Sequence, residues 1–540
     1  MREAVKGLKN PHPGGHPTTH TQARTETRAA ENDRERCRSD RGLGRLASSV
    51  AYVPSPRRTS SLRAMKVSSP TRNGPSLRSE RPEAPDRCID TVSEPVNSAG
   101  TDIYHPWGIM LSKTTRLLLA AGLTASAFAM GSVASASVAP AAPTGHTLPA
   151  NTRFSVTPDN EAAQQALTDL HHGDLTGAAA MAKLASWPEA TWFTSGTPDQ
   201  VREQVRDTVR TAAAEHAVPV LVAYDIPLRD CSQYSAGGAA SDAAYQQWIS
   251  AFAQGVGSSR AVVIVEPDAL ANLPSDCGPT TDPTGTLTAG RIADIKYAVS
   301  ALEARPQTVV YLDAGNSQWH SVGDMAGRLI QAGAGQAQGF FLNVSNYQPT
   351  DQTDRYGTWI SKCVWFATDG PAWAAGHTDY CASQYYSSAA PNDGQPGDAV
   401  SPTDPSTWHW TDAWFDQNVG TPPAAQLTHF VVDTSRNGQG AWTPAPGKYS
   451  GDPQTWCNPP GRGIGAQPTA ATGVPLADAY LYIKTIGESD GSCTRGTAGP
   501  GDPEYGGTVD PAAGAWWPAQ ALTLAQNAVP ALTFNPRLFP

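Results

Sequence analysis

The stretch Val262-Val263-Ile264-Val265-Glu266-Pro267-Asp268 carries the strongest structural signal in this sequence. Four consecutive β-branched apolar residues are typical of a strand buried on both faces, as in the parallel sheet of an α/β protein. The proline cannot continue the hydrogen-bonded ladder, so we expect the strand to end there. Asp268 would then lie at the carboxyl end of the strand, where α/β barrels carry their chemistry. The alternative is that Asp268 only caps the following turn or helix.

Strands and helices alternate on both sides of this stretch. Further strands are expected at about 190–193, 218–226, 308–312 and 339–343, with helices of ten to twenty residues between them. A first helix is expected over about 160–185. This alternation predicts βαβ units and a parallel sheet. Because the repetition comes without a dinucleotide-binding fingerprint, we expect a TIM-like α/β barrel rather than an open sheet.

Two long segments interrupt the alternation. Residues 345–426 are rich in Gly, Pro, Trp, Tyr and Ser and lack clear periodicity, and residues 488–510 are rich in Gly and Pro. Strands resume at 427–433 and 479–484, and a closing helix is expected over 511–528. A loop this long inside a compact domain is usually functional or disordered. Its aromatic residues favour the first alternative, so we expect two long ordered loops beside the active site.

The N-terminal part has a different composition. Residues 1–109 contain 18 of the 39 Lys and Arg residues and almost no apolar periodicity, so we expect them to be disordered or untranslated. A basic start at Met110, a short apolar run and Ala134-Ser135-Ala136 are typical of a secretory signal peptide. A membrane anchor is the alternative, but the apolar run is short. The expected segments are 1–109, 110–136 (signal peptide), 137–150 (linker) and 151–540 (catalytic domain).

Residues 137–540 contain 37 acidic and 19 basic residues, so this part is negatively charged and repels nucleic acid and anionic lipid. We expect a secreted monomer with no membrane contact after signal cleavage. The same part holds 14 of the 15 tryptophans, which suits stacking on sugar rings, although core packing explains some of them. Its six cysteines suggest disulfides, with 15 possible pairings. No zinc motif or phosphate-binding loop is present, so no metal and no cofactor are expected.

Acidic residues follow the expected strands. Asp225, Asp268, Asp313 and Asp433 end or closely follow four of them, and Asp490 follows the last strand at a greater distance. Several carboxylates at one barrel mouth raise one another's pKa, so that one can donate a proton near neutrality. Together with the tryptophans and the absence of a metal motif, this pattern suits acetal hydrolysis by paired carboxylates.

The motifs around these acids resemble those of glycoside hydrolase family 6, the inverting cellulases, and they occur in the family's order from about Trp192 onward. They are Arg229-Asp230-Cys231, Val265-Glu266-Pro267-Asp268, Leu312-Asp313-Ala314-Gly315, Asn343-Val344-Ser345-Asn346-Tyr347, Asp433-Thr434-Ser435-Arg436-Asn437-Gly438, Trp456-Cys457-Asn458-Pro459 and Gly487-Glu488-Ser489-Asp490-Gly491. The resemblance implies a distorted α/β barrel that cleaves β-1,4-glucan with inversion and without a cofactor. One departure is Asn316, where some members have histidine.

The resemblance also implies residue roles. Asp268 matches the general acid, Asp230 matches the aspartate that keeps this acid protonated and relays a proton, and Asp490 matches the proposed base. The serine that holds the attacking water corresponds to Ser235 or a neighbour. The positions that match substrate contacts are Trp192, Tyr224, Asp313, Trp319, Asn343, Trp456, Lys484 and Glu488.

The family pattern pairs Cys231 with Cys277 and Cys457 with Cys493, which leaves Cys363 with Cys381. The two long segments resemble the loops that roof the cleft into a tunnel in cellobiohydrolases, so we expect release of cellobiose from non-reducing chain ends. An open-cleft endoglucanase is the alternative. A barrel hydrolase acting on another β-glycan such as xylan, and a non-catalytic glucan-binding protein, are the other readings.

Overall fold

The computed structural model describes residues 148–158, 160–385 and 399–538, all of which belong to a compact unit spanning Ala127–Pro540. The expected upstream segment and signal peptide lie outside the described residues. Within the described part, no helix combines the length and apolar character needed to cross a bilayer.

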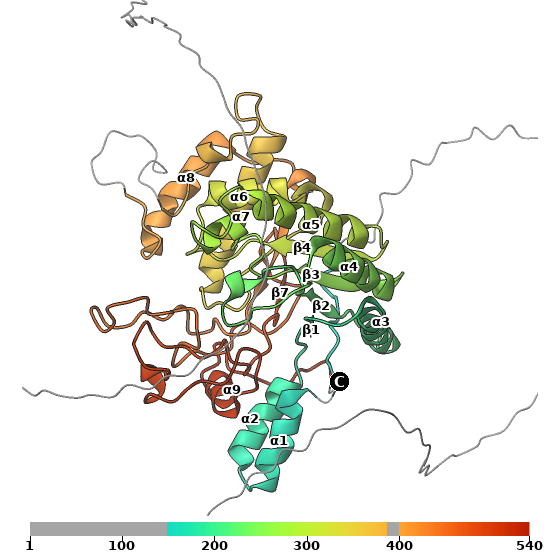
Figure 1. Ribbon diagram of the computed structural model, residues 1–540, viewed down its shortest axis with the longest axis vertical. Coiled ribbons are helices and arrows are strands. Elements are labelled where there is room, and N and C mark those ends of the chain that lie inside the picture. Colours follow the sequence, from blue (N-terminus) through green and yellow to red (C-terminus); the bar gives the residue numbers. More distant parts are fainter. Residues whose placement is uncertain (1–147, 159, 386–398, 539–540) are drawn as a thin grey trace, which may run out of the picture. The chain divides into compact units, whose positions relative to one another are not determined.

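Seven parallel strands form one sheet in sequence order, which confirms the expected α/β architecture (Figure 1). The strands are β1 (Thr191–Phe193), β2 (Val220–Ala223), β3 (Ala261–Val265), β4 (Thr308–Asp313), β5 (Gly339–Leu342), β6 (His429–Asp433) and β7 (Ala477–Leu481). Glu189, just before β1, forms an isolated parallel bridge with Tyr482, just after β7. The sheet therefore curls back on itself and closes at a single bridge, as expected of a distorted barrel.

Alternate strand residues face two separate cores. Val222, Ile264 and Tyr311 belong to an inner cluster inside the curled sheet. Val263 and Val310 belong to an outer cluster that the strands share with the surrounding helices. Both faces of β3 are fully buried, as its run of β-branched residues predicts.

The helices between the strands form the outer layer. They are α3 (Pro198–Ala214), α4 (Asp242–Val256), α5 (Thr286–Glu303), α6 (Val322–Gln331), α7 (Thr350–Thr368) and α8 (His409–Asn418). Helices α1 (Glu161–His171) and α2 (Leu175–Ala185) precede β1, and α9 (Pro518–Gln526) follows β7. Helix α3 illustrates the local code: Thr197 forms a capping box with Gln200, and Val201 lies on its buried face.

Three expectations about helices were wrong. The helix expected over 160–185 is two helices, because the chain turns at Gly173, whose φ is 79°. The closing helix starts at Pro518 rather than at 511. Most importantly, residues 345–426 are not one long loop, since α7 and α8 occupy much of this segment.

Helix α7 was missed although its buried residues recur at helical spacing. A Cβ at Gly357 would lie only 2.9 Å from side-chain atoms of Leu342 and Phe430, so the glycine allows α7 to approach the sheet closely. Trp359 of α7 and Trp408, next to α8, are buried in the outer core. These tryptophans therefore pack the helical layer instead of lining an active-site loop. Residues 386–398 of the segment lie outside the described residues.

Candidate active site

The acids that follow the parallel strands gather at the carboxyl edge of the sheet. Asp268 follows β3 after a two-residue turn, Asp313 ends β4, and Asp230 and Asp490 lie on the segments after β2 and β7. The charges of Asp313, Asp230 and Asp490 all act on Asp268. The structure therefore brings together the three acids that the sequence marks as catalytic.

Asp268 occupies an environment that favours its protonated form. Its backbone is left-handed, with φ at 67°, and its side chain is half-buried. Burial raises the pKa of this carboxyl well above its usual value, and the three neighbouring carboxylates raise it further. A carboxyl group held in this way can still carry a proton near neutral pH, as a general acid requires.

Asp230 is held by a tight turn next to a disulfide. Its Oδ2 accepts hydrogen bonds from the backbone N–H of Ser235 (2.7 Å) and from the Ser235 hydroxyl (2.9 Å). The same hydroxyl lies 3.2 Å from the Tyr224 hydroxyl. Cys231, the next residue, is bonded to Cys277, which fixes the turn from the other side. Asp230, Ser235 and Tyr224 thus form one polar row beside Asp268.

The Asp490 carboxylate accepts four hydrogen bonds from three donors. Arg436 donates from Nη1 to both carboxylate oxygens at 2.9 Å, and its side chain is fully buried. The Tyr347 hydroxyl (3.1 Å) and the backbone N–H of Asn458 (2.9 Å) also donate to Oδ2. Asn458 also accepts a bond from the Asp490 backbone N–H. This arrangement fixes the orientation of the Asp490 carboxylate.

Four of the expected substrate contacts are buried, namely Tyr224, Lys484, Asp313 and Asn343, and the last two are held by backbone atoms. Asp313 is 2% exposed, and its carboxylate accepts from the backbone N–H groups of Leu270, Ala271 and Gly315. Asn343 has no exposed surface, and its amide bonds to backbone atoms of Gln348 and to the Asp433 carbonyl. Both side chains hold the strand-end turns together, so we propose that they position the site.

The three tryptophans among the expected substrate contacts reach solvent to different degrees. Trp319 is 38% exposed, whereas Trp192 and Trp456 are half-buried. Trp192 donates from its indole N–H to the Ile483 carbonyl and meets Tyr224 edge-on, with the ring centres 5.3 Å apart. Lys484 and Glu488 form an ion pair of 3.2 Å.

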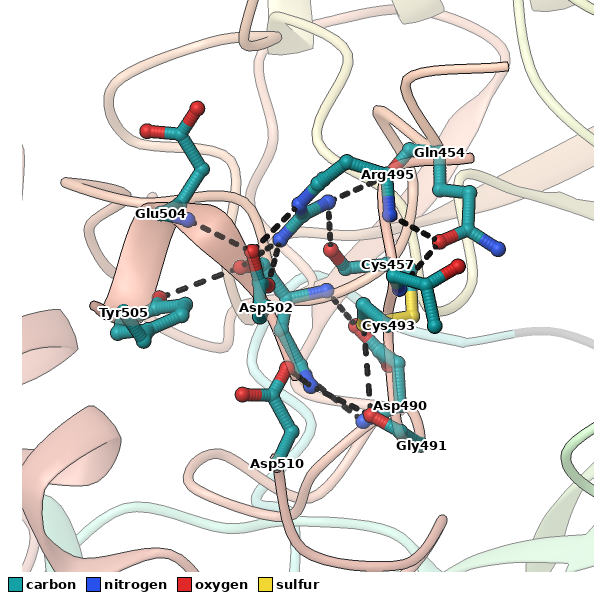
Figure 2. A network of polar contacts seen from close by, with 12 residues as sticks. Gln454, Cys457, Asp490, Gly491, Cys493, Arg495, Asp502, Glu504, Tyr505 and Asp510 are labelled. Atoms are coloured by element: carbon teal, nitrogen blue, oxygen red, sulfur yellow. Dashed lines mark hydrogen bonds and ion pairs between the residues drawn. A yellow bond between two sulfur atoms is a disulfide. The ribbon is translucent and has the colours of Figure 1, made fainter. Parts of the chain in front are cut away.

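Figure 2 shows a polar network beside Asp490 that the sequence analysis did not identify. Arg495 and Asp502 form a fully buried ion pair. Arg495 also donates to the backbone carbonyls of Gln454, Cys457 and Asn458. Arg436 and Asn458 both lie in the motifs quoted above. Arg436 could have been identified from the sequence, because it closely follows a strand-end acid.

All three expected disulfides are confirmed, including Cys363 with Cys381 and Cys457 with Cys493. Within the described residues, the ligand atoms of Cys493, Asp502 and Asp510 are close enough to hold a metal ion. The sulfur of Cys493 is already bonded to Cys457, and Asp502 is paired with Arg495. We therefore assign no metal to this group.

Comparison with known proteins places these features in context. The model of the family "Glycosyl hydrolases family 6" matches residues 149–528. Endoglucanase A of Cellulomonas fimi is 32% identical over 354 residues, which are 65% of this chain and 57% of that protein. Exoglucanase 2 of Hypocrea jecorina is 28% identical over 395 residues, which are 69% of this chain and 72% of that protein.

A solved structure agrees with the same pattern. The endoglucanase Cel6 from Mycobacterium tuberculosis, in complex with methyl-cellobiosyl-4-deoxy-4-thio-β-D-cellobioside, is 34% identical and aligns with a TM-score of 0.50. The alignment covers 70% of this chain and 98% of that one. The family match at residues 149–528 spans all seven strands of the sheet and the acids that follow them.

Proposed function

The chain belongs to glycosyl hydrolase family 6, and from this membership we propose that it is a cellulase that hydrolyses β-1,4-glucosidic bonds with inversion. In such a reaction an acid protonates the leaving oxygen while a water, activated by a carboxylate, attacks the opposite face of the sugar. The observation that carries the proposal is the environment of Asp268, where burial and three carboxylates raise the pKa of a strand-end acid.

Asp268 takes the role of general acid. The adjacent negative charges favour its protonated form, so Asp268 keeps its proton until the glycosidic oxygen accepts it and the glycosidic bond breaks. Asp230 is one of the three carboxylates that, after burial, raise the pKa of Asp268, and it also accepts a hydrogen bond from Ser235. The Ser235 hydroxyl lies between Asp230 and Tyr224, where it is positioned to hold the attacking water.

Asp490 takes the role of base. A base must remain ionised, and the fully buried Arg436 neutralises the charge of Asp490 without donating it a proton. Two further hydrogen bonds restrict the carboxylate to one orientation. The acid and the base therefore occupy environments of opposite character, which is how two carboxyl groups can divide the two roles.

The partner of this site is a β-1,4-glucan chain. Trp192, Trp319 and Trp456 retain exposed ring surface that suits stacking on glucose rings, and Lys484 and Glu488 offer polar atoms to the hydroxyl groups. Asp313 and Asn343 support the turns from below. The glucan is the only partner that we propose. The three disulfides suit a protein that acts outside the cell.

The mode of cleavage is the finer part of the proposal. The expectation of chain-end cleavage rests on two long loops, but α7 and α8 fold much of 345–426 into the outer layer. We therefore propose internal cleavage in an open cleft. Chain-end cleavage remains the alternative, because Tyr234 and Gln454 touch through a hydrogen bond of 3.1 Å and so join two loops beside the site. The family contains relatives named for either mode.

Sugar release from cellulose and from xylan tests the proposed function. The wild type should release reducing sugar from cellulose much faster than from xylan. Asp268→Ala should lose roughly 10²-fold or more of this activity, the share that general acid catalysis supplies. Asp199→Ala serves as the control, because the Asp199 side chain is 82% exposed and lies on α3. Equal rates for wild type and Asp268→Ala would remove the acid assignment, and binding without hydrolysis by the wild type would indicate a glucan-binding protein.

A further inference from the structure

Asn458 is a buried polar residue at the centre of the network next to Asp490. It has no exposed surface, and its backbone is left-handed with φ at 39°. It directly follows Cys457, whose disulfide with Cys493 joins this segment to the one that carries Asp490. A left-handed asparagine is tolerated better than most residues, but burying its amide is favourable only if the amide is hydrogen-bonded.

Asn458 forms two hydrogen bonds with Asp490. Its backbone N–H donates to Asp490 Oδ2 at 2.9 Å, and its side-chain Oδ1 accepts from the Asp490 backbone N–H at 2.8 Å. The first bond orients the carboxylate, and the second fixes the backbone from which the carboxylate projects. Together they leave Asp490 little freedom to rotate or shift.

The rest of the Asn458 amide anchors this grip. Its Nδ2 lies 3.0 Å from each of three acceptors, namely Ser489 Oγ, the Gly491 carbonyl and Asp510 Oδ2. The backbone carbonyl of Asn458 accepts a hydrogen bond from Arg495, and Arg495 is paired with the buried Asp502. An aspartate at this position would keep the acceptor but lose every Nδ2 donor and face Asp510 with a second negative charge.

The two oxygens of Asp490 are left in unequal states. Within the described part of the chain, Oδ2 accepts from Arg436, Tyr347 and Asn458, whereas Oδ1 accepts from Arg436 alone. Oδ1 is therefore the oxygen with capacity for a water. We propose that Asn458 is a positioning residue that presents Asp490 Oδ1 to the attacking water. This inference rests on the proposed function, in which Asp490 is the base.

Two variants separate the amide from the backbone. Asn458→Gly keeps the backbone N–H and suits a positive φ, but removes the side chain. Asn458→Asp keeps the shape and removes the donors. On a soluble cello-oligosaccharide, both should lower kcat by about 10²-fold, as a small misplacement of a reacting group can do, with KM unchanged within roughly threefold. Asn535→Ala is the matched control, because Asn535 is also buried but bonds to Ser186 and Arg537.

A double-mutant cycle with Asp490→Ala provides the decisive measurement. If Asn458 acts through Asp490, Asn458→Gly should cause no further loss of kcat in the Asp490→Ala background. Equal fold losses in both backgrounds, or a raised KM with unchanged kcat, would overturn the proposal. Melting temperatures show whether Asn458→Gly is folded. If it is not, Asn458→Asp replaces it in the double-mutant cycle. A wild-type rate in Asp490→Ala would overturn the base assignment and this inference together, whereas an inactive wild type would overturn the proposed function itself.

Discussion

Asp313 Oδ2 accepts a hydrogen bond of 2.7 Å from the backbone N–H of Ala271. The bond joins the end of β4 to the turn that carries Asp268, and a second bond from the Leu270 N–H to the same oxygen reinforces it. Asp313 is also the first of the three carboxylates that raise the pKa of Asp268. One buried carboxylate thus sets both the position and the protonation of the proposed acid.

Asp313→Asn is expected to move the basic limb of the activity profile to lower pH. Removing the Asp313 charge lowers the pKa of Asp268, so the proposed acid loses its proton at a lower pH. The profile of kcat/KM against pH on a cello-oligosaccharide measures this shift. Asp433→Asn is a matched control, because Asp433 is an equally buried strand-end acid that bonds to backbone N–H groups but is not among the carboxylates acting on Asp268. An unmoved limb in Asp313→Asn would contradict the electrostatic role.

Asp268→Asn is expected to stabilise the protein at pH 7. The folded state raises the pKa of Asp268, so the folded state binds its proton more tightly than the unfolded chain does. Stability from this group is therefore fully present below the unfolded pKa near 4 and is lost as pH rises toward the folded pKa. The asparagine avoids that loss and should gain roughly 0.5–2 kcal/mol at pH 7, with little gain at pH 4. Urea unfolding at both pH values measures the difference, and a gain equal at both would speak against titration of Asp268.

Hydrolysis is expected to release the α-anomer first. The proposed base and acid act on opposite faces of the sugar, so the β-linkage is inverted in a single displacement. Proton NMR of a fresh digest of a β-1,4 oligosaccharide reads the anomer before mutarotation obscures it. Early accumulation of β-product would require a covalent intermediate and would rule out Asp490 as a base acting through water.

The sequence was informative wherever function depends on strand ends. The branched apolar run before Pro267 is enough to place Asp268 at the sheet edge, because parallel strands bring their carboxyl ends together. It was not informative about where side chains point. Asn343 and Asp313 belong to motifs of the site, yet both are buried beneath it. Helix α7 was missed although Tyr356, Ile360 and Val364 recur at helical spacing, because the composition of residues 345–426, rich in Gly, Pro and Ser, indicated a loop.

The buried Arg495–Asp502 pair is expected to be far more important for stability than the nearby exposed pair. Both side chains of the first pair have no exposed surface, so Arg495→Met leaves a buried carboxylate without its partner and should cost about 3–5 kcal/mol. Lys448 pairs with Glu504 in the same region but is 44% exposed, so Lys448→Met should cost much less than Arg495→Met. Chemical denaturation of the two variants measures both values. Similar losses would mean that the buried pair is compensated elsewhere.

We expect the enzyme to cleave the glucan chain internally rather than at its ends. An open cleft requires that no loop cross above the acids, and three features agree with this. Helices α7 and α8 lie in the outer layer. Only eleven residues separate Asp230 from the start of α4 at Asp242, which limits any roof from that side. The segment after Asp490 packs against the one before Trp456, where Lys448 contacts Glu504 and Gln454 accepts from the Arg495 N–H.

Soluble carboxymethylcellulose distinguishes the two modes, because internal cuts shorten long chains and lower viscosity quickly, whereas chain-end cuts do not. We expect a rapid fall in viscosity for each reducing end formed. A slow fall with cellobiose as the main product would support the chain-end mode instead. Tyr234→Ala removes the contact with Gln454 and tests whether these loops close over the chain. If the cleft is already open, this variant should leave the ratio of viscosity loss to new ends unchanged, as should Tyr380→Ala, a control tyrosine that is 45% exposed.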